Sequence, residues 1–284
     1  MDMIIFSKDR AFQLYTALET INKYVSGINT IYVQIAYSEQ KYLDGYLKLN
    51  ELFGNVIFVD ETEHGFYTTL TALLKEIKTK TIAMDVDDVI YYDKINLEDC
   101  ANVLMNHSDV LKFTYNFNPK WYNIGLTGNK EDYTIIDRNK SFGSDVVNFS
   151  IKYPFNVSWS IYTTESLIEL LQRHNFKNPI DLESKSCNDF AFNQCKYNLY
   201  GVKEVAQQIH LNNFLNRYDT TYTTDTLNDY FLNNEVINID KINFNDFDPD
   251  MRWINNKDIG RFPIFPWEIA PKYHKQIIEN RRKI

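Results

Sequence analysis

Short apolar runs alternate with helically spaced apolar residues over the first 110 residues of the chain. The runs are short and rich in β-branched and aromatic residues, which predicts buried strands at 3–6, 28–36, 56–59, 81–86 and 110–115. Between them, the apolar spacing predicts helices at 14–25, 42–53, 66–77 and 97–105, the last with Asn96 and Asp99 as a capping pair. This alternation is typical of an α/β fold, a parallel sheet with helices on both faces.

The second half of the chain is less regular. Residues 116–160 are rich in Asn, Tyr, Gly and Trp and show little periodicity, and 129–132 and 138–141 are interpreted as surface loops. Helices are predicted at 165–171 and 181–197. Beyond about residue 215, prolines interrupt a polar and aromatic sequence that ends in a predicted short helix, 272–282. We therefore divide the chain into a principal domain, 1–215, and an irregular C-terminal extension, 216–284, packed on it.

Composition and charge argue against membrane-spanning and nucleic-acid-binding proteins. The 284 residues are 44% hydrophobic, enough for a sizeable core, and no apolar run approaches the roughly 18 residues of a membrane span. The N-terminal segment lacks the pattern of a signal or transit peptide, so we expect a cytoplasmic protein. The net charge of −8 argues against nucleic acid as a partner, because neutralising phosphates requires a basic face. The basic segment 272–283 is interpreted either as a peripheral contact with an anionic membrane or as a solvated helix.

Polar residues follow the predicted strands where parallel sheets bind ligands, beyond the carboxyl ends of the strands. These ends read Ser7-Lys8-Asp9-Arg10, Tyr37-Ser38, Asp60-Glu61 and Asp85-Val86-Asp87-Asp88. The last has the clearest chemistry, because an apolar strand runs directly into three carboxylates.

The three carboxylates indicate a metal–diphosphate site. The strand period of two puts Asp85 and Asp87 on one side and Asp88 on the other. Two carboxylates on one side repel each other unless a cation lies between them, and Mg²⁺ takes one or two carboxylates together with substrate phosphate oxygens. This interpretation requires the acids to face an open cleft and not to pair with Lys or Arg. The alternative is a solvated acidic turn that helps to cap the next helix.

The order of these motifs resembles the GT-A-fold nucleotide-sugar glycosyltransferases, particularly family 2-like members. The resemblance rests on an apolar strand that ends in a polar segment with Arg10, a following helix, and an acidic motif after three strand–helix units. Two weaker matches follow. Residues 159–165 are similar to an acceptor-side segment of the family, and 178–183 are similar to a stretch seen in some relatives. The whole resemblance covers about 1–215. The resemblance implies a GT-A-like (Rossmann-like) and mostly parallel sheet flanked by helices.

The resemblance also implies roles for individual residues on the donor side. The nucleotide base and phosphates would contact Ser7, Lys8, Arg10 and Gln13, and the base or ribose would lie between Tyr37 and Ser38. Asp85 would face the ribose or a metal-bound water, and Asp87 would ligate Mn²⁺ or Mg²⁺ on the diphosphate. Asp88 would take the place of Asp87 if the motif is x-D-D instead of D-x-D. The alternatives are a surface charge for Arg10 and a plain loop for the Tyr-Ser pair.

On the acceptor side, the resemblance implies contacts from Trp159 and Tyr162. An inverting reaction needs a carboxylate base, for which Asp189 and Glu183 are the candidates, although Asn-Asp replaces the Glu-Asp pair usual in the family. His210 would complete the metal shell. The alternatives are packing for Trp159, a solvated helical acid for Asp189 and a structural histidine.

The function expected from these features is metal-dependent transfer of a sugar from a nucleotide-diphosphate sugar, with UDP as the expected nucleotide. The acceptor would be a hydroxyl of a glycan, a lipid-linked molecule or a protein. Two alternatives stay open. Asp85 and Asp87 also resemble the nucleophile and general acid of haloacid dehalogenase-like phosphatases, although that family carries its motif on the first strand. A non-catalytic nucleotide-sugar-binding module would use the same scaffold. A nucleotidyltransferase fits less well, because no Gly-rich phosphate loop follows the first strand.

Overall fold

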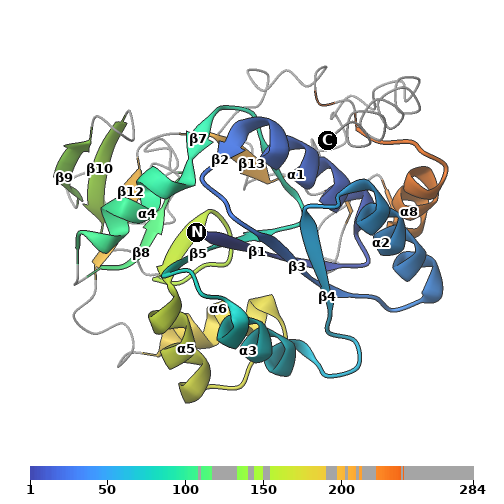
Figure 1. The fold of residues 1–284 in the computed structure, drawn as a ribbon, viewed down its shortest axis with the longest axis horizontal. Helices are drawn as coiled ribbons and strands as arrows, with labels where there is room; N and C mark the ends of the chain where they lie inside the picture. The colour runs from blue at the N-terminus through green and yellow to red at the C-terminus, as the bar shows by residue number, and fades with distance from the viewer. Residues whose placement is uncertain are drawn as a thin grey trace.

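A mixed β-sheet with helices on both faces forms the centre of the protein (Figure 1). The computed structural model describes residues 1–107, 110–116, 133–139, 144–149, 154–189, 197–201, 204–208, 211–212, 222–237 and 239. In these ranges nine strands form the sheet, in the order β4-β3-β1-β5-β11-β8-β12-β10-β9. They are β1 (Asp2–Lys8), β3 (Ile31–Ala36), β4 (Val56–Asp60), β5 (Thr81–Val86), β8 (Val110–Thr114), β9 (Tyr133–Asn139), β10 (Ser144–Phe149), β11 (Ser160–Thr163) and β12 (Tyr197–Gly201).

Most strands of the sheet run in one direction. β4, β3, β1 and β5 are mutually parallel, and β12 is parallel to β8. β11 lies antiparallel between β5 and β8, and β10 lies antiparallel between β12 and β9. Among the described strands, therefore, β10 and β11 alone are reversed, which confirms the predicted mostly parallel sheet. The carboxyl ends of β1, β3, β4 and β5 consequently lie along one edge.

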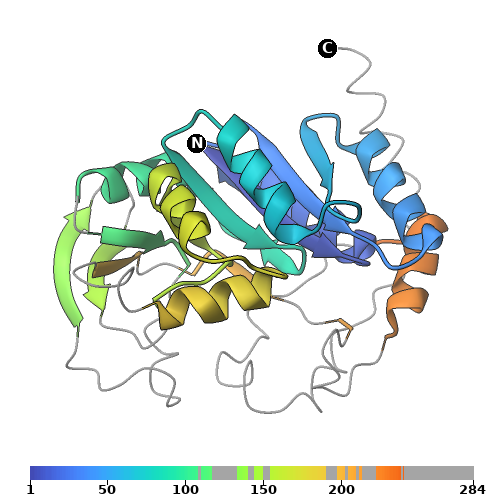
Figure 2. The ribbon, with the colours of Figure 1, turned by 90° about the horizontal axis from the view of Figure 1, so that it is seen from below.

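Two layers of helices cover the sheet (Figures 1 and 2). One layer holds α1 (Ala11–Tyr24), α2 (Gln40–Leu52) and α4 (Leu97–Met105), and the other holds α3 (Phe66–Glu76), α5 (Thr164–Arg173) and α6 (Pro179–Asn188). The alternation of β1 explains why both layers are needed. Met3 and Ile5 face the core shared with α1, α2 and α4, whereas Ile4 and Phe6 face the core shared with α3, α5 and α6.

The start of α4 shows how local sequence sets an element. The Asn96 side chain accepts a hydrogen bond from the backbone N–H of Glu98 at 3.1 Å, as the predicted cap requires. Gly27, with φ +82°, lies against this cap, and a Cβ there would come within 2.4 Å of Asn96 Oδ1. Only glycine therefore allows β2 (Val25–Ser26), which pairs with β7 (Ile95–Asn96), to approach so closely.

Two predictions for the second half of the chain are wrong. The predicted loop 138–141 overlaps β9, which runs to Asn139, and the segment 116–160, which shows little periodicity, also contributes β10. The predicted helix 181–197 is shorter: α6 ends at Asn188, and β12 has begun by Tyr197. Edge strands of polar, aromatic sequence show little alternation, so pairing with a neighbouring strand decides their structure. The predicted helix 272–282 lies outside the described residues.

The described part of the C-terminal extension packs on the principal domain. Its helix α8 (Thr224–Leu232) lies against α2, coloured orange beside blue in Figure 1. Lys48 Nζ donates hydrogen bonds to the carbonyls of Phe231 at 2.5 Å and Leu232 at 3.2 Å, at the C-terminal end of α8. At the other end, the Tyr42 hydroxyl donates to Asp225. Cations near a helix C-terminus stabilise it, so α2 holds α8 at both of its ends.

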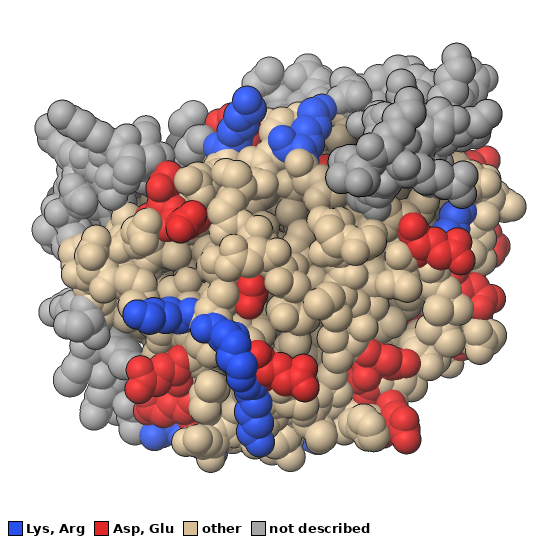
Figure 3. All heavy atoms as spheres, viewed as in Figure 1, with Lys and Arg blue, Asp and Glu red and all other residues tan. Residues whose placement is uncertain are grey.

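The surface is mixed in charge. On the face of Figure 3, described Lys and Arg side chains lie interspersed with Asp and Glu, and no continuous basic patch covers the described part of this face. None of the helices in the described ranges has both the length and the apolar character that crossing a bilayer needs.

Candidate active site

A tight turn after β1 brings Arg10 to the edge of the sheet. Asp9 has φ +57°, a left-handed conformation that Asp adopts more readily than most residues. Its N–H donates to the carbonyl of Ala36 at 3.2 Å, and its Oδ1 accepts from the N–H of Ser38 at 2.7 Å. These contacts fix the reversal, so that α1 starts at Ala11 with Arg10 directed towards the end of β5.

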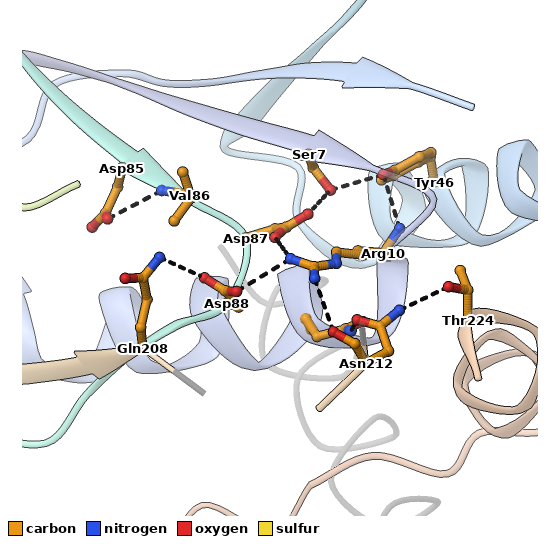
Figure 4. Close-up of polar contacts among 11 residues, drawn as sticks. Ser7, Arg10, Tyr46, Asp85, Val86, Asp87, Asp88, Gln208, Asn212 and Thr224 are labelled. Carbon is orange, nitrogen blue, oxygen red and sulfur yellow. Dashed lines mark hydrogen bonds and ion pairs between the residues drawn. The ribbon is translucent and has the colours of Figure 1, made fainter. Parts of the chain in front are cut away.

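Asp87 and Asp88, which we call the acid tip, form the turn between β5 and β6 (Val89–Tyr91). The N–H of Asp87 donates to the carbonyl of Phe6 at 3.2 Å, which holds the tip beside β1. Arg10 Nη1 lies 3.1 Å from Asp87 Oδ1 and 3.2 Å from Asp88 Oδ2 (Figure 4). The two acids are 3% and 5% exposed. The expectation of an open tip without a basic partner is therefore wrong in this structure.

A chain of hydrogen bonds orients the first acid of the tip. Ser7 Oγ donates to Asp87 Oδ2 at 2.8 Å and is also hydrogen-bonded to the Tyr46 hydroxyl at 2.7 Å. Because the serine proton points to the aspartate, the tyrosine donates to the serine. The Tyr46 oxygen in turn accepts from the Arg10 N–H at 3.2 Å. Sequence reasoning missed Tyr46, because nothing in α2 marks it as different from the other buried aromatic residues.

A second set of contacts closes the tip from the side of β13 (Ala206–Gln208), which pairs with β6. Gln208 Nε2 donates to the second acid at 3.1 Å, and the Asn212 carbonyl accepts from Arg10 Nη2 at 3.3 Å. The Asn212 side chain accepts from Gln13 Nε2 and donates to Thr224 Oγ1, both at 2.8 Å. Gln208 and Asn212 were also missed, although they flank the predicted ligand His210, which lies outside the described residues.

Burial and charge oppose each other at the tip. Burial raises the pKa of Asp87 to about 6, while Arg10 lowers it and the neighbouring carboxylate of Asp88 raises it. Burial lowers the pKa of Arg10, but the two carboxylates raise it more, so the guanidinium stays charged. Two negative charges and one positive charge leave the cluster with a net charge of −1. The cluster can therefore accept more positive charge, for example a divalent cation in place of the guanidinium.

Asp85 belongs to a different cluster. It is 1% exposed, and it accepts hydrogen bonds from the hydroxyls of Tyr91 at 2.5 Å and Tyr115 at 3.3 Å. Burial raises the pKa of Asp85 to about 7 against these hydrogen bonds, which lower it. Figure 4 shows Asp85 directed away from the acid tip. The predicted shared side for Asp85 and Asp87 is wrong, because β5 ends at Val86 and strand alternation stops there.

The other donor-side residues fall into two groups. Lys8 is exposed at the rim, and Tyr37 lies nearby in a half-buried position, where a hydrogen bond to Asp60 raises its pKa. Ser7 and Gln13 are 6% and 4% exposed. Their side chains bind the tip and Asn212 in this structure, and their direct contact with a donor stays a prediction.

On the acceptor side, the structure separates the two predicted aromatic residues. Trp159 is half-buried with φ +54°, an unusual conformation for a bulky residue, and its carbonyl accepts from Tyr115 N at 3.0 Å. Tyr162 is fully buried because β11 lies inside the sheet. Its hydroxyl donates to the Asn156 carbonyl at 2.8 Å, and its ring stacks on Phe155. Tyr162 is thus buried in this structure, and its acceptor contact stays a prediction.

The two candidate bases lie on α6 or at its end. Glu183 Oε1 accepts from the N–H of Val157 at 2.8 Å, in the loop that precedes β11. Asp189 caps α6 and pairs with Arg173, Nε to Oδ2 at 2.6 Å, and with His174 Nε2 at 2.7 Å. Asp189 thus joins the ends of α5 and α6. Its role as a base stays a prediction.

The carboxylate ligands of the acid tip fit one kind of metal site. Within the described residues, no group of three or more His, Cys, Asp or Glu side chains is arranged to hold a metal ion. Asp87 and Asp88 offer two carboxylates that converge on one point, and Mg²⁺ is commonly bound by that number together with substrate phosphates. The tip therefore fits a cation that is shared with a diphosphate, and not one that the described residues hold alone.

Sequence comparison relates the chain to a glycosyltransferase. No family model matches the sequence. The bifunctional glycosyltransferase pgtA of Dictyostelium discoideum is 31% identical over 124 residues, which is 41% of this chain and 16% of that protein. The chain thus spans less than a fifth of the length of this curated relative. The match confirms the resemblance to glycosyltransferases drawn from the acidic motif.

Solved structures show only a loose likeness. The crystal structure of S. aureus TarS 1-349 aligns with a TM-score of 0.47 at 16% identity, over 72% of this chain and 60% of that one. The mannosyltransferase PcManGT from Pyrobaculum calidifontis, in complex with GDP-Man and Mn²⁺, aligns with a TM-score of 0.40 at 13% identity, over 62% of this chain and 46% of that one. Likenesses at this level carry no weight for the function of this chain.

Proposed function

We propose that this chain is a glycosyltransferase that moves a sugar from a nucleotide-diphosphate sugar to an acceptor hydroxyl, with Mn²⁺ or Mg²⁺ and the diphosphate at the acid tip. One observation carries the proposal. Two buried carboxylates converge on one point beyond the carboxyl ends of the parallel strands β1 and β5. Arg10 occupies that point in this structure, so the proposal requires the cation to displace it. The sequence similarity to a glycosyltransferase supports it.

The chemistry explains why such a site is needed. The acceptor oxygen bonds to the anomeric carbon, the bond from that carbon to the diphosphate breaks, and the nucleoside diphosphate leaves with added negative charge. A divalent cation, when bound, stabilises that charge as a Lewis acid. Asp87 and Asp88 would hold the cation, and Ser7 keeps Asp87 oriented. The planar guanidinium of Arg10 is suited to phosphate oxygens.

The remaining parts of the donor and acceptor sites follow from the same proposal. Lys8, Tyr37 and Ser38 would line the nucleotide at the rim, with UDP as the expected nucleotide, and Trp159 would contact the acceptor. In an inverting reaction a carboxylate takes the proton of the acceptor hydroxyl. Glu183 and Asp189 are both proposed for this step. The acceptor would be a glycan, a lipid-linked molecule or a protein.

The phosphatase alternative finds less support. It requires Asp85 to attack a phosphoryl group, but this carboxylate is 1% exposed and is hydrogen-bonded by two tyrosine hydroxyls. A nucleophile in that position would first have to lose both tyrosine hydrogen bonds and become exposed.

A donor assay tests the proposal. The protein is incubated with UDP-, GDP- and dTDP-linked sugars, with and without Mn²⁺, and the release of nucleoside diphosphate is measured. We expect metal-stimulated release from one donor class and a loss of about 100-fold or more in Asp88→Asn, because the cation that stabilises the departing charge loses one of its two carboxylates. The control is Asp44→Asn, since Asp44 is exposed on α2 and contacts Gln40.

Three results would contradict the proposal. Phosphate release from p-nitrophenyl phosphate would favour the phosphatase. Metal-independent binding of a nucleotide sugar without turnover would favour a binding module. Equal activity of Asp88→Asn and Asp44→Asn would remove the acid tip from the reaction.

A further inference from the structure

Arg10 occupies the point on which the two carboxylates of the acid tip converge. A single nitrogen, Nη1, lies 3.1 Å from Asp87 Oδ1 and 3.2 Å from Asp88 Oδ2. A divalent cation bound by both acids would need the same position, since each acid directs an oxygen to it. The guanidinium and a divalent cation therefore cannot both be there.

The attachment of Arg10 allows its side chain to leave while its backbone stays. The backbone is fixed by the preceding turn and by the hydrogen bond from the Arg10 N–H to the Tyr46 hydroxyl. The side chain is held at the tip by the two acids and by Nη2, which donates to the Asn212 carbonyl at 3.3 Å, and it is 13% exposed. The contacts at the tip therefore hold the guanidinium in place, and a small part of the side chain is open to solvent.

Charge decides where the guanidinium goes when a cation replaces it. Two carboxylates with a guanidinium carry a net charge of −1, and two carboxylates with a divalent cation carry none. A guanidinium displaced from a neutral cluster is no longer attracted to it. A diphosphate bound to the cation offers the guanidinium anionic oxygens in a geometry that suits its forked N–H donors.

We propose that Arg10 is a built-in counter-ion of the acid tip that competes with the divalent cation for Asp87 and Asp88 and then binds the diphosphate. This rests on the proposed function for the identity of the ligand. It makes Arg10 a donor-positioning residue with two opposite effects: it weakens metal binding to the protein alone and strengthens binding of the nucleotide. A merely structural role would weaken both.

The experiment is a Mn²⁺ titration of the full chain without nucleotide, followed by the loss of the EPR signal of free Mn²⁺. In Arg10→Met, which keeps an unbranched apolar stem and removes the charged guanidinium, Mn²⁺ is expected to bind at least about tenfold more tightly than in the wild type. Arg10→Lys keeps the charge and is expected to stay close to the wild type. In Arg10→Met with Asp88→Asn the gain should disappear, because the cation loses one of its two carboxylates.

The matched control is Arg173→Met, which removes an arginine from another buried aspartate, Asp189, and should leave Mn²⁺ affinity unchanged. A thermal melt establishes that each variant is folded, and Arg10→Gln replaces Arg10→Met if the latter does not fold. In a second titration, with saturating Mn²⁺, the affinity of Arg10→Met for UDP is expected to fall about tenfold.

Folded Arg10→Met or Arg10→Gln that binds Mn²⁺ no more tightly than the wild type would overturn the inference, and so would unchanged UDP affinity. If nucleoside diphosphate is released with Mn²⁺ but the variant gains no Mn²⁺ affinity, the inference fails and the proposed function stands. If the variant gains Mn²⁺ affinity but no nucleotide sugar is turned over, the competition stands and the proposed function fails.

Discussion

Lys112 is a buried cation whose removal should stabilise the protein in a pH-dependent way. It lies on β8, it is 2% exposed, and its ammonium donates a hydrogen bond to the Asn156 side chain. The Tyr200 ring lies 5.7 Å from Nζ. Burial lowers the pKa of Lys112 from the ordinary 10.5 to about 7, although the neighbouring Cys187 and Glu183 raise it. Lys112→Met keeps the volume and removes the charge.

The magnitude follows from linkage. Between pH 7 and 10.5 the unfolded chain binds a proton that the folded chain does not, so stability rises with pH across this window. Below pH 7 Lys112 is protonated in both the folded and the unfolded state, and the folded state carries the full free-energy cost of burying its charge. Each pKa unit is worth about 1.4 kcal/mol, so that penalty is about 5 kcal/mol, and about 2 kcal/mol of it is left at pH 9. The gain in stability from Lys112→Met should therefore be about 3 kcal/mol larger at pH 6 than at pH 9.

The assay is urea denaturation of the wild type and Lys112→Met at pH 6 and pH 9, followed by tryptophan fluorescence. The lost hydrogen bond to Asn156 lowers the stability of the variant equally at both pH values, so the difference between them isolates the charge. Lys185→Met is the control, because the Lys185 side chain is 41% exposed and its ammonium pairs with Asp181 at the surface. The same gain for Lys112→Met at both pH values would refute the reasoning, and so would a larger gain at pH 9.

Two further predictions concern packing. Gly45→Ala should lower the free energy of unfolding by about 1–3 kcal/mol, despite the better helix propensity of alanine. The reason is that the new Cβ would lie 2.7 Å from the Ala11 Cβ and 2.9 Å from Asn228 Oδ1. Urea denaturation measures this, and an unchanged midpoint would show that α8 shifts without cost in stability. Arg173→Ala should lower the melting temperature, because the buried carboxylate of Asp189 loses its two-point partner; calorimetry of the variant measures this, and an unchanged melting temperature would contradict it.

The strands and helices of the first half could be predicted because their signals are local. The apolar runs that became β1, β4 and β5 and the cap at Asn96 depend on residues within one element. β11 could not be predicted in its place, because its insertion between β5 and β8 depends on pairing with strands about 50 and 80 residues away. No local pattern contains that information.

The candidate site was predicted in part for the same reason. The acids and Arg10 stood out, because polar residues directly follow buried strands. Their pairing did not, since Arg10 and Asp87 are 77 residues apart in the chain. The different fates of Asp85 and Asp87 depended on where β5 ends, and a period-two pattern does not fix the last residue of a strand. The role of Asn212 could not be predicted, because it contacts Arg10 and Gln13, which lie far from it in the sequence.

The most direct test of the central claim is the position of Mn²⁺ in crystals soaked with Mn²⁺ and UDP, located by anomalous diffraction. The account predicts a peak about 2 Å from carboxylate oxygens of Asp87 or Asp88 and from both phosphates of the nucleotide, with Arg10 turned from the acids to the diphosphate. A nucleotide bound elsewhere, with Arg10 still paired to both acids and no anomalous peak at the tip, would contradict it.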